Sequence, residues 1–211
     1  MNHEAASTDV IVDVREKGNL DRSTIVATAL RLLDEVGIEG LSTRRLAAEL
    51  GIKSASLYWH FKDKDELLNE MSSMMFVECL QAFVAVKSQS DALEWLAESA
   101  RVLRRVALSR RDGAQVMARP MLRAPANKAA FEDCVRTLGR AGVPDMEARV
   151  MLQTLRRLAI GTAIQEQTNA ALSAASGIVC TSEEAFELGL QIFIEGVKVR
   201  IAAASAVSHP A

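Results

Sequence analysis

The stretch SASLYWHF, residues 54–61, brings together side chains that can donate hydrogen bonds. It holds the only tyrosine of the chain, one of its two tryptophans and one of its three histidines at consecutive positions, Tyr58, Trp59 and His60. When exposed, their hydroxyl, indole N–H and imidazole groups are suitable donors to phosphate oxygens. Basic residues gather on both sides of the stretch, at Arg44, Arg45, Lys53, Lys62 and Lys64. The pattern therefore indicates non-covalent contact with a polyanion.

Two helices are predicted ahead of this stretch. Asp21 can cap the first, in which apolar residues recur at helical spacing, and Gly37 suits its left-handed exit. The second helix is shorter, since it starts near Ser42 and stops at Gly51.

A third helix is predicted over residues 54–61, and the turn LGIK joins it to the second in a helix-turn-helix pattern. On this helix Leu57 can face the core, while the aromatic residues after it divide between a buried flank and the surface. A fourth helix is expected to begin at Asp63, with Glu66 reaching back in a variant of the capping box.

Charge supports the contact with a polyanion only in part. The chain has a net charge of −2 and a pI of about 6.0. Acids are at least as numerous as bases between Leu20 and Glu70, so the basic residues form a local face rather than a basic domain. The pattern favours DNA binding over an ordinary helical bundle, although three-helix turns also occur in proteins that never meet DNA.

Composition and the motifs that are missing limit the fold class and the other functions that the sequence allows. The 211 residues are 49% apolar and only 4% aromatic, which predicts an all-α protein with a small domain and a larger one. Motifs for a metalloprotease, a serine hydrolase or a phosphate-binding loop are missing, so no enzyme, cofactor or metal site is predicted. Cys79, Cys134 and Cys180 lie far apart; a redox role is the weaker alternative to inert packing. Without a signal peptide or a spanning segment, we expect a cytoplasmic protein with no membrane contact.

The residues 20–68, LDRSTIVATALRLLDEVGIEGLSTRRLAAELGIKSASLYWHFKDKDELL, closely resemble the DNA-binding domain of the TetR (tetracycline repressor) family of bacterial transcriptional regulators. LYWHFKDK is the most specific part. A weaker similarity extends into the core, where LSRRDGAQV resembles a loop and helix of the family and FELGLQIFIEGV its final dimerising helix. The resemblance implies a double-stranded DNA operator and a small-molecule effector as partners.

The resemblance also implies roles for single residues. Arg44 matches the position that reads a guanine in the major groove. An arginine suits this role, because its guanidinium can hydrogen-bond to O6 and N7 of the base together. The positions that mostly hold phosphates, sugars or a thymine methyl are Thr43, Ser56, Tyr58, Trp59, His60 and Lys64. Ser54 and Ala55 replace the glutamine and proline of tetracycline-binding members, so the operator should differ from theirs. Two alternatives stay open: Trp59 packs beneath the helix, and Arg45 pairs with acids on its own surface.

The rest of the chain is predicted as a helical core. Helices should start near Ser90, run through Phe131 and Leu138 after the loop ARPMLRAPAN, and cover MEARVMLQTLRRLAIGTAIQEQ and EEAFELGLQIFIEGVKVRIAAA, the last capped by Thr181. Small residues on the last two segments, Gly161, Ala163, Gly189 and Gly196, allow close approach. The resemblance implies that this pair forms a homodimer interface; a single-chain core is the alternative. The expected domains are a disordered arm (1–19), a DNA-binding domain (20–66), an effector-binding and dimerisation domain (67–204) and a flexible tail (205–211).

The resemblance places the effector pocket at Leu80, Ser99, Leu103 and Met117. No imidazole stands at the positions that bind metal in tetracycline-binding members, so a tetracycline–magnesium chelate is not expected. The methionines Met74, Met75, Met117 and Met121 indicate either an adaptable apolar cavity or plain core. The sequence thus predicts a homodimeric repressor of a palindromic operator, released by a small, largely apolar effector.

Overall fold

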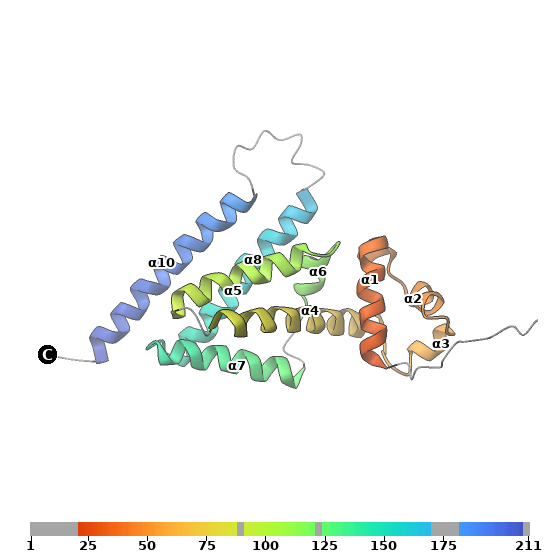
Figure 1. The fold of residues 1–211 in the computed structure, drawn as a ribbon, viewed down its shortest axis with the longest axis horizontal. Helices are drawn as coiled ribbons and strands as arrows, with labels where there is room; N and C mark the ends of the chain where they lie inside the picture. Colours follow the sequence, from red (N-terminus) through yellow and green to blue (C-terminus); the bar gives the residue numbers. More distant parts are fainter. Residues whose placement is uncertain (1–20, 88–90, 121–123, 170–181, 209–211) are drawn as a thin grey trace, which may run out of the picture.

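The computed structural model describes residues 21–87, 91–120, 124–169 and 182–208, and these residues form helices and no strand (Figure 1). The all-α prediction is confirmed for this part of the chain. The helices, in order, are α1 (Arg22–Gly40), α2 (Thr43–Glu49), α3 (Ser54–Leu57), α4 (Lys64–Lys87), α5 (Ala92–Leu108), α6 (Gly113–Met117), α7 (Pro125–Arg140), α8 (Asp145–Asn169) and α10 (Ser182–Ser208).

The starts of the first two helices follow from their predicted caps. The Asp21 carboxylate accepts a hydrogen bond from the Thr24 N–H at 2.7 Å, and the Ser42 hydroxyl accepts one from the Arg45 N–H at 3.2 Å. Each bond satisfies a backbone donor that has no partner inside the helix. Gly37 has the positive φ expected for it, +71°, but it kinks α1 rather than ending it, since the helix continues to Gly40.

The third helix is shorter than predicted. α3 ends at Leu57, and residues 58–60 form a turn in place of the helix expected over 54–61. The amide N–H groups of His60 and Phe61 both donate to the Leu57 carbonyl, at 2.9 and 2.8 Å, which closes this turn. Phe61 is thereby buried against the core at 5% exposure. Tertiary burial of one ring therefore overrides the local helical pattern.

The start of α4 is tied to α1. The Glu66 N–H donates to Asp63 Oδ1 at 2.8 Å, while Glu66 Oε2 accepts from the Lys62 N–H at 2.8 Å. This is the predicted capping-box variant, with Glu66 bonded one residue further back. Arg22 of α1 pairs with Glu66 at 2.8 Å and lies over the Phe61 ring, 4.4 Å from its centroid. These contacts set the angle between the N-terminal helices and α4.

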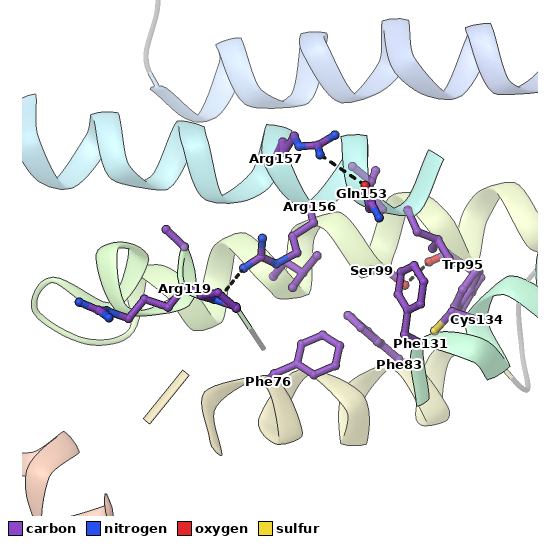
Figure 2. A pocket seen from close by; sticks show the side chains of 15 residues that line it. Phe76, Phe83, Trp95, Ser99, Arg119, Phe131, Cys134, Gln153, Arg156 and Arg157 are labelled. Carbon is purple, nitrogen blue, oxygen red and sulfur yellow. Dashed lines mark hydrogen bonds between the residues drawn. The ribbon is translucent and has the colours of Figure 1, made fainter. Parts of the chain in front are cut away.

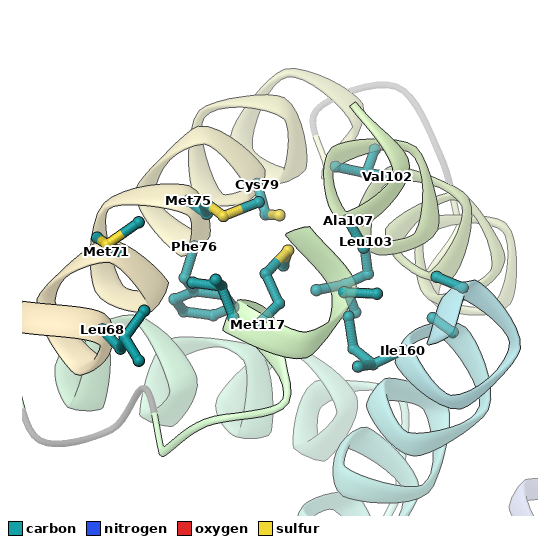
Figure 3. Close-up of a cluster of buried hydrophobic side chains, with 14 of the residues drawn as sticks. Leu68, Met71, Met75, Phe76, Cys79, Val102, Leu103, Ala107, Met117 and Ile160 are labelled. Carbon is teal, nitrogen blue, oxygen red and sulfur yellow. The ribbon is translucent and has the colours of Figure 1, made fainter. Parts of the chain in front are cut away.

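α4 belongs to both halves of the molecule. It starts beside α1 and runs into the larger bundle of α5, α6, α7, α8 and α10 (Figure 1). The predicted domain boundary after residue 66 therefore falls within this helix. Its buried side chains meet those of α5, α6 and α8 in one apolar cluster (Figure 3). Met75 and Met117 are buried there at 0% and 2% exposure, so these two methionines are plain core.

Two arginines of α5 connect it to the C-terminal helices. Arg101 binds Glu187 of α10 through two nitrogens, and Arg104 binds Glu166 of α8 in the same bidentate way, with contacts of 2.8–2.9 Å. The cap of α5 is Asp91, which accepts from two backbone N–H groups.

Several predictions lie outside the described residues: the arm (1–19), Ser90, Met121 and the Thr181 cap. α10 continues to Ser208, so residues 205–208 of the segment predicted as a flexible tail belong to a helix.

Candidate functional site

A helix-turn-helix forms one end of the molecule, where α2 packs on α1 and α3 packs on α2 (Figure 1). The turn between them contains Gly51 at φ +66°, a conformation that favours glycine. The Ile52 N–H donates back to the Ala47 carbonyl at 2.9 Å, and Leu46 and Leu57 are buried beneath the turn. The Gly51 conformation, the hydrogen bond from Ile52 to Ala47 and the two buried leucines therefore fix the angle between α2 and α3.

Three large side chains on this unit are free to meet another molecule. Trp59 is 89% exposed and Tyr58 is 59% exposed, which is unusual for aromatic residues. Arg44 is exposed and makes no hydrogen bond or ion pair with any described residue. The alternative in which Trp59 packs under the recognition helix is therefore wrong for this chain.

The other predicted DNA contacts lie on the same unit. Thr43 opens α2, the residues Ser54, Ala55 and Ser56 form most of α3, and His60 lies in the turn after it. Ala55 is exposed and the others are half-buried. The structure places them as a compact group, and their roles toward DNA stay predictions.

Two basic residues make contacts within the protein. Lys64 Nζ donates to the Ile38 carbonyl at 2.7 Å, so it would have to leave this oxygen to reach a phosphate. Arg45 donates to the Gly40 carbonyl at 3.3 Å and forms no ion pair among the described residues, so the expected pairing with acids is not observed.

A cavity of about 530 Å³ lies in the larger bundle, between α4, α5, α7, α8 and the end of α6 (Figure 2). Its size and mainly apolar walls are typical of small-molecule sites. The lining residues are Phe76, Phe83, Trp95, Ser99, Leu103, Ala118, Arg119, Pro120, Phe131, Cys134, Leu152, Gln153, Leu155, Arg156 and Arg157.

The cavity includes two of the four residues predicted for effector binding. Ser99 and Leu103 line it, and the Ser99 hydroxyl donates to the Trp95 carbonyl at 2.8 Å. Leu80 and Met117 do not line it, because both pack into the apolar core beside it. The structure therefore supports the position of the pocket more than its full list of residues.

Sequence reasoning missed the aromatic wall and one cation. Trp95 could have been found, because it precedes Ser99 by one helical turn and Leu103 by two. Phe76 and Phe83 on α4 meet edge to face with centroids 6.4 Å apart, and Phe131 of α7 lines the same cavity (Figure 2). Arg156 on α8 gave no signal, since it is one of many arginines in the sequence.

The described residues give little indication of a reactive thiol, a metal site or a membrane span. Burial, followed by the charge of Glu78, raises the pKa of the Cys79 thiol to about 12, so this thiol is a poor nucleophile. Cys134 borders the cavity, and Cys180 lies outside the described residues. No group of three histidine, cysteine or carboxylate side chains gathers as a metal site in the described ranges. Among the same ranges, no helix is long and apolar enough to cross a bilayer.

Both halves of the molecule match known protein families. Residues 25–71 match the bacterial regulatory proteins of the tetR family, and residues 87–176 match the tetracyclin repressor-like C-terminal domain. The class A tetracycline repressor protein from transposon 1721 of Escherichia coli is 35% identical over 148 residues, which cover 70% of this chain and 68% of that protein. The chain belongs to the TetR family.

Solved structures share most of this arrangement of helices. A variant of TetR from Acinetobacter baumannii AYE in complex with minocycline is 32% identical, with a TM-score of 0.72 over 85% of this chain and 97% of that one. BioQ with its natural double-stranded DNA operator is 28% identical, with a TM-score of 0.62 over 87% and 99%. The TetR fold of this chain, an N-terminal helix-turn-helix followed by a helical C-terminal domain, therefore matches relatives solved with a ligand and with DNA.

Proposed function

We propose that this TetR-family chain represses transcription as a homodimer on a palindromic operator and is released by a small, largely apolar effector. The effector binds in the cavity between α4, α5, α7 and α8. Relatives solved with an operator and with minocycline support the two ligand classes. A cytoplasmic location follows from this proposal, because the DNA target lies there.

The observation that carries the proposal is the course of α4. Its first residue, Lys64, is bonded to the DNA-binding unit, and Phe76 and Phe83 of the same helix line the cavity. A helix is stiff over this length, so a ligand that displaces the cavity end also displaces the DNA-binding end. One element therefore connects the effector to the recognition helix.

A second connection runs through Ile38 at the end of α1. Its N–H donates to Asp112 Oδ2 at 2.8 Å, from the loop before α6, and its carbonyl accepts from Lys64 of α4. The same loop contacts α1 again, where the Arg111 N–H donates to Asp34 Oδ1 at 3.0 Å. α1, α4 and α6 thus meet at one residue, so motion of either core helix reaches the DNA-binding unit.

An apolar surface on the last helices supports the homodimer. Leu188 and Ile192 of α10 are exposed one turn apart, and Val199 continues the same face two turns on. Met146 and Val150 are exposed on α8, whose start is joined to the end of α10 by the Glu147–Arg200 ion pair at 2.8 Å. Large exposed apolar side chains in such a stripe typically mark an interface.

Selection of bound fragments from random DNA tests the operator. We expect an enriched palindrome whose half-sites lie about one helical turn apart, roughly 34–36 Å. Arg44→Ala should weaken binding by about 1–3 kcal/mol and relax preference at one base position in each half-site. Arg136→Ala, which removes an exposed arginine from α7, is the matched control and should leave both unchanged. Failure to enrich any sequence contradicts the proposal.

The effector is tested by a thermal-shift screen followed by release of the selected DNA. Apolar hits should release DNA without added magnesium, and EDTA should not alter the release. Release by magnesium–tetracycline alone, with no effect from apolar hits that bind, contradicts this part of the proposal and leaves the DNA-binding part intact.

A further inference from the structure

The effector cavity carries positive charge that no described acidic residue in its wall neutralises. Its lining includes three arginines and no aspartate or glutamate. Arg119 pairs outward with Asp65 at 3.1 Å, and Arg157 donates to Gln153 at 3.3 Å. Arg156 forms no ion pair with any residue that the structure describes. It is the one lining arginine whose charge is both partly buried and without an acid or amide partner there.

Among the described residues, Arg156 is held by backbone carbonyls alone. Its Nη2 donates to the carbonyl of Met117 and to that of Arg119, the latter at 3.1 Å, and its Nε is buried without a partner (Figure 2). Burial, and then the nearby charge of Arg157, lowers the pKa of this guanidinium. A partly buried cation without a counter-charge is unfavourable unless a ligand supplies one.

A second donor that lines the cavity, on α5, also lacks an acceptor among the described residues. Trp95 is 2% exposed and lines the cavity, and its indole Nε1 is buried with no hydrogen-bond partner in the ranges that the structure describes. Buried N–H groups are nearly always paired in native proteins, so two unpaired donors that line one cavity indicate an absent acceptor. The rings of Phe76, Phe83 and Phe131 complete the wall and suit a flat apolar body (Figure 2).

We infer that the cavity binds an aromatic organic acid, with its rings between the aromatic side chains and its ionised carboxylate, sulfonate or phenolate paired with Arg156. This rests on the proposed function, because it names the chemical class of the effector of that same cavity. A neutral apolar molecule would fill the volume and leave both donors buried without acceptors. An anion satisfies them and neutralises the guanidinium, so the site should discriminate between an acid and its neutral counterpart.

A matched pair of fluorescent probes tests this discrimination on the full chain without DNA. 1-Anilinonaphthalene-8-sulfonate and N-phenyl-1-naphthylamine share their rings, and only the first carries an anionic group. We expect one sulfonate site per chain and an affinity for the sulfonate at least about tenfold above that for the neutral amine, as for a hydrogen-bonded ionic contact. Arg156→Gln should remove most of this preference, and Arg156→Lys should retain part of it.

Arg105→Gln is the control for net charge, because Arg105 is 65% exposed on α5, where it pairs with Glu98 at 3.7 Å, and does not line the cavity. It should keep the full preference. If Arg156→Gln fails to melt cooperatively, Trp95→Phe takes its place; loss of the indole N–H should weaken the sulfonate more than the amine. Equal affinities of the two probes for the wild-type protein, or an unchanged preference in folded Arg156→Gln, overturn the inference.

Release of selected operator DNA separates this inference from the proposed function. If the sulfonate binds through Arg156 and leaves DNA bound, the ligand class stands and the release mechanism fails. If neutral aromatic compounds release DNA and their acids neither bind nor release it, the release mechanism stands and the inference fails.

Discussion

The joint between α1 and the loop before α6 should be sensitive to one added methyl group. Gly37 has φ +71° and ψ 175°, a conformation that is essentially restricted to glycine. A Cβ atom at this position would lie 2.7 Å from Asp112 Oδ2 and 3.0 Å from Arg111 Nε. Gly37→Ala therefore strains the backbone and displaces the carboxylate that accepts from the Ile38 N–H.

Two contributions set the expected loss. A non-glycine residue in this backbone region costs about 1–3 kcal/mol. The hydrogen bond from Ile38 to the charged Asp112 carboxylate contributes about 1.5–3 kcal/mol, and it cannot be kept with the methyl group in place. Together they predict a loss of about 2.5–6 kcal/mol in the free energy of unfolding. For a chain of this size that lowers Tm by roughly 5–20 °C.

Calorimetry at fixed protein concentration is the assay, since Tm of a dimer depends on concentration. Gly51→Ala is the matched control, because Gly51 has φ +66° and a Cβ there would meet nothing within 4 Å. Gly51→Ala should lower the free energy of unfolding only by the cost of the backbone conformation, about 1–2 kcal/mol. A double-mutant cycle with Asp112→Gly isolates the contact, and the two changes should be less than additive. Equal losses for Gly37→Ala and Gly51→Ala, or strict additivity in the cycle, would refute this reasoning.

Three further outcomes follow from single contacts. Glu66→Gln should lower Tm at pH 7; the bond to Arg22, and then that to the Lys62 N–H, lowers the pKa of Glu66. Its stabilisation is present above the ordinary value of 4.5 and is lost as pH falls through the lower folded value, so the Tm difference should shrink in acid. Gly139→Ala should raise stability by about 1 kcal/mol, because a methyl group there meets nothing within 4 Å in α7. Gly196→Leu should leave the chain folded and reduce dimer mass in light scattering, because Gly196 is exposed on α10 with open space around it.

Each of these has a clear contrary result. If the Tm difference between the wild type and Glu66→Gln stays constant from pH 7 to acid, the charge of Glu66 does not contribute to stability. A lower Tm for Gly139→Ala means that the added methyl group does not meet the open space on which this prediction rests. An unchanged dimer with Gly196→Leu removes this face of α10 from the interface, and a wild-type monomer removes the interface itself.

The sequence predicted the parts of the fold that depend on neighbours along the chain. The Asp21, Ser42 and Asp63 caps each require one side chain and an N–H group three residues on, so local sequence suffices. The length of α3 was mispredicted, because the turn after Leu57 is closed by the burial of Phe61 against another part of the fold.

The two candidate sites also differ in how far they could be predicted from residues that are neighbours in the sequence. The helix-turn-helix lies within one continuous segment, and its exposed group of donors could be predicted from residue types alone. The cavity combines side chains from residue 76 to residue 157, and the Ile38–Asp112 bond joins positions 74 apart in the sequence. Such contacts depend on how helices pack, so Trp95 could be predicted from its spacing on α5, but the phenylalanines of the wall and the isolated charge of Arg156 could not.

Arg156 also connects the effector cavity to the joint between α1 and the loop before α6. It donates to the Met117 carbonyl at the end of α6, while Asp112 at the start of α6 holds Ile38 in the DNA-binding unit. An acidic ligand competes with that carbonyl for the guanidinium, so it favours arrangements in which the end of α6 is released. Allosteric coupling typically amounts to about 1–3 kcal/mol, or roughly 5–150-fold in affinity. A single hydrogen bond to a charged group contributes about 1.5–3 kcal/mol, so loss of the bond between Arg156 and the Met117 carbonyl is of the size that such coupling requires.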